Sequence, residues 1–159
     1  MTMQIKETRY SVSKGVLYGL LGGFIGVFIM GGIASMMPIP GTGGAPFFVA
    51  AAMLMGLGSM AWTAGWLMHI LTGLIVGAIF GIVVTKVSKL SVRSVARGLG
   101  LGVLAGLILW IVFFLPMMAM LMPSLMSMGT MVAGSFAAHL IYGALLGITV
   151  GALLPRSAS

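Results

Sequence analysis

Two histidines are the residues of this sequence best placed to do chemistry. His69 precedes Lys86 by the same number of residues as His139 precedes Arg156. At about 1.5 Å per helical residue, each imidazole is expected roughly 25 Å from a basic end. This equal spacing would let the pair hold a haem b, or a copper ion with thioether help. Alternatively, each neutral imidazole forms a hydrogen bond with a neighbouring helix and fixes the packing.

The methionines form the second candidate site. Thirteen of the 16 lie within residues 36–68 and 117–131, away from the lysines and arginines. Met118, Met122 and Met126 follow one another at the four-residue spacing of a helix face. Thioethers are soft ligands that suit Cu(I), and the cluster resembles the methionine-rich outer segments of copper transporters. The alternative is that methionine is a flexible apolar filler, suited to irregular contacts with partner subunits.

Acidic and thiol chemistry is nearly absent from the sequence. Glu7 is the only carboxylate side chain, and there is no aspartate or cysteine. Paired-carboxylate catalysis, carboxylate cages for hard cations and thiolate metal sites are therefore excluded. A P-loop, a dinucleotide fingerprint and a nucleophile–base pair are also missing. We therefore expect no enzymatic activity and, apart from haem b or copper, no cofactor.

The composition places the chain in a membrane. Of its 159 residues, 60% are hydrophobic and only 6% are charged, whereas a soluble domain usually carries about 25% charged residues. We predict an all-α integral membrane protein, a single domain over residues 1–159, with the lipid bilayer as its solvent. The four predicted spans cover residues 15–37, 62–85, 98–115 and 131–154. Residues 45–57 are apolar but too short to cross, so they predict a re-entrant or interfacial helix.

The basic residues predict the orientation. All eight lysines and arginines precede the first span, lie between the second and third, or follow the last. By the positive-inside rule, both termini and the middle connection are cytoplasmic in a multi-pass protein of the cell (inner) membrane. The formal charge of +7 is therefore a topology signal, and we expect no binding of nucleic acid.

An internal repeat is the most informative pattern in the sequence. The glycines of the first span return at one constant offset in the third, beginning with Gly15 and Gly98. His69 and the glycines after it return at a second constant offset in the fourth span, beginning with His139. Repeat 1 covers about residues 14–86 and repeat 2 about residues 97–156. Each is a helical hairpin that begins on the cytoplasmic face, so the two are parallel repeats.

The repeated glycines predict close helix packing. They are Gly15, Gly19, Gly23, Gly73, Gly77, Gly81, Gly98, Gly102, Gly106, Gly143, Gly147 and Gly151. Since every fourth residue is a glycine, they lie along one face of each helix and let two backbones approach closely in lipid. The alternative is that this face leaves room for a flat cofactor.

One segment resembles a pattern known from other proteins. HLIYGALLG (His139–Gly147) resembles a His-Leu-x-Tyr-Gly run in small uncharacterised prokaryotic membrane proteins, especially archaeal ones. His69 lies in HILTGLIVG, which departs from that run at Thr72. The resemblance implies a multi-span architecture of helical hairpins and no particular activity.

These features together favour a non-catalytic accessory subunit of a larger membrane complex. A respiratory or copper-dependent oxidase or monooxygenase is the expected complex, and other membrane subunits are the expected partners. Two alternatives stay open. One is a haem b- or copper-binding membrane protein that uses His69 and His139. The other is a small channel or transporter that passes a neutral species along the glycine-lined axis.

Overall fold

The computed structural model describes residues 11–155, and every regular element among them is helical. The helices are α1 (Val12–Ser35), α2 (Phe47–Leu54), α3 (Ala61–Lys86), α4 (Val95–Leu109), α5 (Leu115–Leu121) and α6 (Gly129–Leu153). Short 3₁₀ turns cover Gly58–Met60, Ser88–Leu90 and Pro123–Ser127, and a π-helical turn covers Trp110–Phe114. Four segments are long and apolar enough to cross a membrane, which confirms the predicted number of spans.

The third span runs further than predicted. The sequence predicts an end at Leu115, but one apolar span continues from Val95 to Leu121. Pro116 lacks an N–H group and would clash with the preceding turn of a regular α-helix. The wider π-helical turn lies directly before Pro116 and accommodates it. The helix therefore bulges where the proline suggests a stop.

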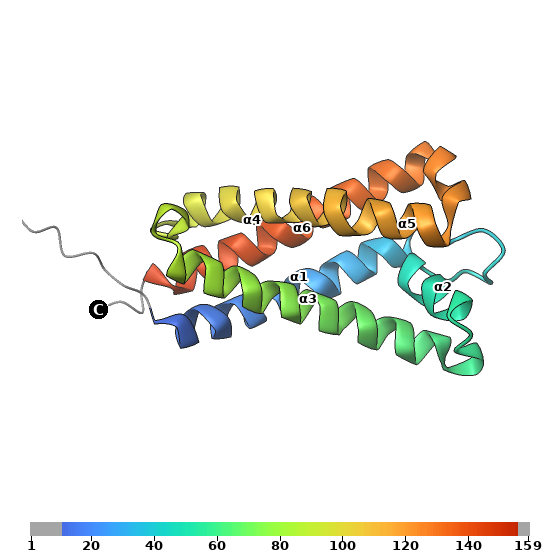
Figure 1. The fold of residues 1–159 in the computed structure, drawn as a ribbon, viewed down its shortest axis with the longest axis horizontal. Helices are drawn as coiled ribbons and strands as arrows, with labels where there is room; N and C mark the ends of the chain where they lie inside the picture. Colours follow the sequence, from blue (N-terminus) through green and yellow to red (C-terminus); the bar gives the residue numbers. More distant parts are fainter. Residues whose placement is uncertain (1–10, 156–159) are drawn as a thin grey trace, which may run out of the picture.

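The charges gather at one end of the bundle. Figure 1 shows the start of α1, the α3–α4 connection and the end of α6 at that end, which we call the basic end. Its described cations are Lys14, Lys86, Lys89, Arg93 and Arg97. Helix α2 and the α5–α6 connection lie at the opposite end, which we call the methionine end (Figure 1). Lys6, Arg9 and Arg156, which also support the predicted orientation, lie outside the described residues.

Glycines bring α1 against α3, and α4 against α6. A Cβ added to any of the 12 repeated glycines would lie under 3.0 Å from a neighbouring heavy atom. That atom is most often a carbonyl oxygen of the partner helix, and the contact is reciprocal for Gly19 with Gly77 and for Gly102 with Gly143. The helices therefore touch backbone to backbone, and the repeated face is filled by the partner helix. Such close approach replaces the missing hydrophobic drive for helix association in lipid.

The two glycine contacts differ in register by one helical turn. The carbonyl that a Cβ on Gly15 would meet belongs to Gly81, whereas the one that its counterpart Gly98 would meet belongs to Gly147. Gly151, and not Gly147, is the counterpart of Gly81 in the repeat. One helical turn corresponds to about 5.4 Å along a helix. Helix α6 is thus shifted towards the basic end, relative to the position that α3 takes beside α1.

A third interface joins α1 to α6 through two further glycines. Gly22 and Gly26 of α1 lie against Leu146 and Tyr142 of α6, with the tyrosine ring over Gly26. The Tyr142 hydroxyl donates a hydrogen bond to the Gly73 carbonyl of α3 at 2.7 Å. One buried side chain therefore connects three helices, and α1 and α6 form the centre of the bundle.

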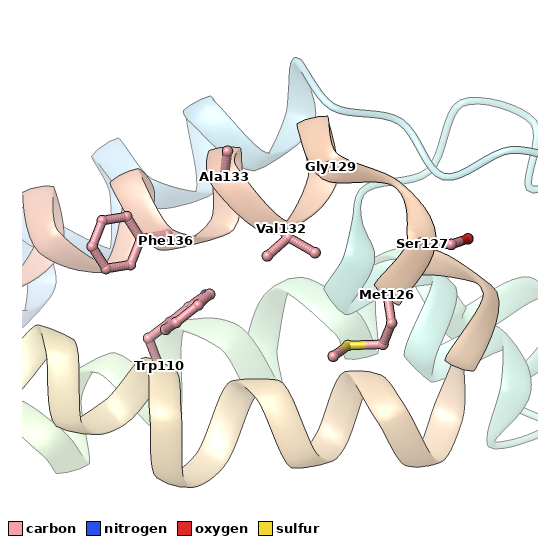
Figure 2. Close-up of a pocket in the computed structure, with 7 residues that line it drawn as sticks. All are labelled: Trp110, Met126, Ser127, Gly129, Val132, Ala133 and Phe136. Atoms are coloured by element: carbon pink, nitrogen blue, oxygen red, sulfur yellow. The ribbon is translucent and has the colours of Figure 1, made fainter.

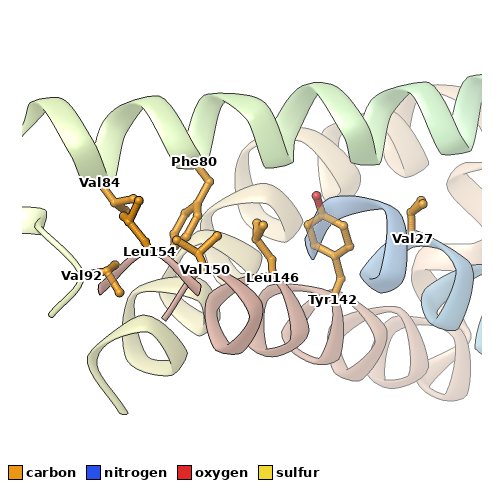
Figure 3. Packing of buried hydrophobic residues seen from close by; sticks show 8 residues of the cluster. All are labelled: Val27, Phe80, Val84, Val92, Tyr142, Leu146, Val150 and Leu154. Atoms are coloured by element: carbon orange, nitrogen blue, oxygen red, sulfur yellow. The ribbon is translucent and has the colours of Figure 1, made fainter. Parts of the chain in front are cut away.

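Hydrophobic side chains fill the interior. Figure 3 shows Phe80 and Val84 of α3 near Val150 and Leu154 of α6, with Val92 of the α3–α4 connection beside them. All five are buried. Side chains of α4 pack against this cluster from the remaining side, namely Leu101, Ala105 and Leu109. The space between the four long helices at this level is thus a packed core.

Gly102→Val is expected to destabilise the fold by about 1–3 kcal/mol, the usual cost of overpacking. Its Cβ would meet the Gly143 carbonyl and lie 2.7 Å from the Gly147 Cα. Gly100, on the same helix, has nothing within 4 Å of an added Cβ, so Gly100→Val is the matched control. Thermal unfolding in detergent measures both variants. An equal loss of stability in the two would contradict the backbone contact.

Candidate functional site

His69 is held by α1 and α2 near the methionine end. Its Nε2 lies 3.2 Å from the Val27 carbonyl oxygen, and because a carbonyl only accepts, Nε2 is the donor. Phe48 stacks on the imidazole, with ring centroids 4.4 Å apart and planes 12° from parallel. Trp66, one turn earlier on α3, approaches the same imidazole edge-on at 6.1 Å. The ring is therefore fixed in both position and tautomer.

His139 is held within the second helix pair. It is buried, and its Nδ1 donates to the Ser135 carbonyl one turn earlier at 2.8 Å. The Phe114 ring lies 4.8 Å away, centroid to centroid, in a tilted arrangement. The Ser135 hydroxyl accepts from the Trp110 indole N–H at 3.0 Å and donates to the Val132 carbonyl at 2.9 Å. The two histidines thus form different hydrogen bonds, one across helices and one within α6.

Helix α2 connects the two histidine environments. Its first residues are Phe47 and Phe48, and while Phe48 stacks on His69, Phe47 packs on Phe114 at 4.9 Å. Phe114 in turn contacts His139. We call these five residues the aromatic row. The imidazoles share no hydrogen bond or ring contact with each other, so the phenylalanines of this row stand between them.

A tight loop determines where α2 begins. Gly41, Gly43 and Gly44 all have positive φ, which favours glycine. The Thr42 hydroxyl donates to the Ile39 carbonyl at 2.6 Å and accepts from the Ala45 N–H at 3.1 Å. Pro46 then occupies the position just before the first helical turn. The loop therefore sets the start of α2 and the direction in which its two phenylalanines point.

Each imidazole, when neutral, keeps one nitrogen with a lone pair. This nitrogen is Nδ1 in His69 and Nε2 in His139, because the other nitrogen donates to a carbonyl. Metal ligation uses such a lone pair. A haem or metal ion bridging the two imidazoles would have to displace the phenylalanines of the aromatic row. Residues 11–155 hold no group of three or more His, Cys, Asp or Glu. The geometry favours the packing interpretation of both histidines.

The predicted methionine trio is not brought together. Met118 and Met122 are buried in one cluster with Leu125, whereas Met126 is 42% exposed and lines a separate groove. Helix α5 ends at Leu121, and Met122 has a non-helical backbone with φ −144° and ψ 65°. The four-residue spacing therefore does not continue on one helix face, and the expectation of a shared site for all three is wrong.

The groove that Met126 lines lies between the π-helical turn and α6. Its volume is about 460 Å³, and Figure 2 shows the rings of Trp110 and Phe136 near each other at one end. Their centroids are 5.0 Å apart. Met126 and Val132 lie further along it (Figure 2). The lining is mostly apolar, so the groove offers contact surface and few groups that react.

Sequence reasoning found the histidines but not the residues that hold them. The available signal was a pair of adjacent phenylalanines in each half, Phe47–Phe48 and Phe113–Phe114. Only Phe114 of the second pair faces inward, since Phe113 is 64% exposed. Tyr142, the link to α3, had a weaker signal, because it stands where the first half of the repeat has Thr72.

Comparison with protein-family models, curated proteins and solved structures finds no match to this chain. The resemblance of the His139 segment to small prokaryotic membrane proteins therefore stays a prediction. The function has to be argued from the geometry of the chain itself.

Phe114→Leu is expected to destabilise the fold by about 1 kcal/mol beyond the loss of buried area, because aromatic pairs contribute about 0.5–1.5 kcal/mol each. The substitution removes the ring contacts with Phe47 and His139. Phe113→Leu is the control, since Phe113 is the exposed neighbour. Thermal unfolding in lipid nanodiscs compares the two. If Phe113→Leu costs as much as Phe114→Leu, the aromatic row does not stabilise the fold.

Proposed function

We propose that this chain is a non-catalytic accessory subunit of a larger membrane complex and that its methionine end binds the partner. The supporting observation is exposed apolar surface without charge at that end. Met36 and Met120 are each 82% exposed, and Met60 is 67% exposed. Residues 36–60 and 116–130 contain no charged side chain. Exposed apolar patches of this kind mark interaction sites.

Lipid alone gives a weaker account of this surface. Residues at the ends of membrane helices meet headgroups and water, where aromatic and charged side chains are typical. Met36 follows α1, Met60 precedes α3, and Met120 lies in the last turn of α5. A methionine-rich end at this level fits burial beneath another subunit, because flexible thioether side chains adapt to irregular surfaces.

A respiratory or copper-dependent oxidase or monooxygenase is the partner class that we favour. Thioethers are soft ligands that suit Cu(I), so a methionine-rich end is chemically compatible with a copper enzyme beside it. The chain itself supplies contacts and no reacting groups in this proposal. The bilayer surrounds the remaining apolar faces of the helices.

The proposal includes an orientation and a duplication. The basic end faces the cytoplasm by the positive-inside rule, so both termini are cytoplasmic in the cell membrane. Helix α2 then lies at the opposite face as a re-entrant or interfacial helix. The α1–α3 and α4–α6 pairs represent two parallel repeats, which the matching sets of glycine contacts support.

Single cysteines test the orientation, since the chain has no cysteine of its own. Ser124→Cys lies at the methionine end and Ser88→Cys at the basic end, and both positions are exposed. A membrane-impermeant maleimide should label Cys at position 124 in intact cells, and Cys at position 88 only after permeabilisation. The reverse pattern would invert the proposed topology.

A second candidate is a redox or metal-binding role for His69 and His139. The aromatic row between two fixed imidazoles is the observation that favours it. The purified protein should then show a Soret band or one equivalent of copper, and neither is expected from the accessory role. A channel for a neutral species has less support, because partner backbones fill the glycine faces and side chains fill the core.

Photo-cross-linking tests the accessory role most directly. A photoreactive residue at Met120 should give one discrete adduct with another membrane protein in native membranes. The same residue at Ile75, 58% exposed in the middle of α3, is the control for a lipid-facing position. No adduct at Met120, or only a dimer of this chain, would overturn the proposal.

A further inference from the structure

We propose that the methionine end holds a binding site for a soft monovalent cation, Cu(I), formed by Met53, Met122 and Met128. These residues belong to two segments far apart in the sequence, and all three line one pocket. The site deepens the proposed function, since a copper-dependent partner would meet it at the shared surface. It differs from the trio suggested by spacing, of which only Met122 remains.

The pocket has a volume of about 650 Å³ and lies between the end of α2 and the α5–α6 connection. Met53 comes from α2, and Met122 and Met128 flank the 3₁₀ turn Pro123–Ser127. Met122 is buried, and the other two are half-buried. The break in the helix at Met122 separates it from Met126 and turns the chain so that Met128 meets the same pocket.

The chemistry of the lining selects the kind of ion. Thioether sulfur is a soft, neutral donor that prefers Cu(I) over hard cations. No carboxylate, imidazole or thiolate lines the pocket, so ligands that favour Zn²⁺ or Mg²⁺ are missing from it. A neutral site also favours a monovalent ion, because a buried divalent charge without an anionic partner is costly.

The size of the pocket requires the side chains to close around an ion. A volume of about 650 Å³ is larger than one ion needs, so the sulfurs must converge on it. Methionine has three rotatable bonds and adapts readily, whereas a leucine of similar volume offers no donor. Small residues leave room for this movement, since Ala50 and Gly41 also line the pocket.

Titration of the purified full-length protein with Ag⁺, a redox-inert substitute for Cu(I), tests the proposal in chloride-free detergent buffer. The wild type should bind one Ag⁺, detected by calorimetry and by metal analysis after desalting. Met53→Leu/Met122→Leu/Met128→Leu should lower the affinity at least tenfold, because leucine keeps the volume and removes the sulfur. Met36→Leu/Met60→Leu/Met120→Leu is the control, with three exposed methionines changed.

Methyl NMR of the wild type keeps the test valid if the triple variant fails to fold. Ag⁺ should shift the ε-methyl resonances of Met53, Met122 and Met128 together, at one equivalent, and leave those of Met36 and Met120 in place. No stoichiometric binding, equal loss in the control variant, or shifts spread over all methionines would overturn the site. Because the isolated chain is measured, these outcomes are independent of whether a partner subunit is found.

Discussion

The structure depends on the close approach of backbones at glycine faces. Lipid solvates apolar side chains as well as another helix does, so burial of leucine or valine gives these helices little reason to associate. Glycine removes the side chain that would hold the backbones apart, as the reciprocal Gly19–Gly77 and Gly102–Gly143 contacts illustrate. Every feature of the methionine end, including the aromatic row and the pockets, is positioned by these two helix pairs.

The halves of the chain are alike in sequence but pack unequally at the centre. Tyr142 reaches across Gly26 to the Gly73 carbonyl, which joins α6 to α1 and α3. At the offsets of the repeat, Leu109 replaces Gly26, and Thr72 replaces Tyr142. The hydroxyl of Thr72 donates within its own helix to the Met68 carbonyl. A small–large pair therefore closes one seam, and its counterpart lacks both the space and the ring to do the same.

Sequence alone predicted the spans and the glycine faces, because charge, hydropathy and four-residue spacing are local signals. It placed the helix start near Pro46 for the same reason. It failed where tertiary contacts decide: the helix continues through Pro116 by a π-helical turn, and Met126 leaves the face of Met118. The histidines were found as rare polar residues, but Phe47 and Phe48 look like any apolar pair until α2 is packed.

The central claim is that the two helix pairs touch through glycine backbones in registers that differ by one turn. Solid-state NMR on specifically labelled protein in bilayers measures this directly, because cross-peaks between backbone carbons report short distances across an interface. The account predicts that the carbonyl carbon nearest to Gly23 belongs to Gly73, whereas the one nearest to its counterpart Gly106 belongs to His139. A stronger cross-peak of Gly106 with the Gly143 carbonyl, or no cross-peaks between the helices, would contradict it.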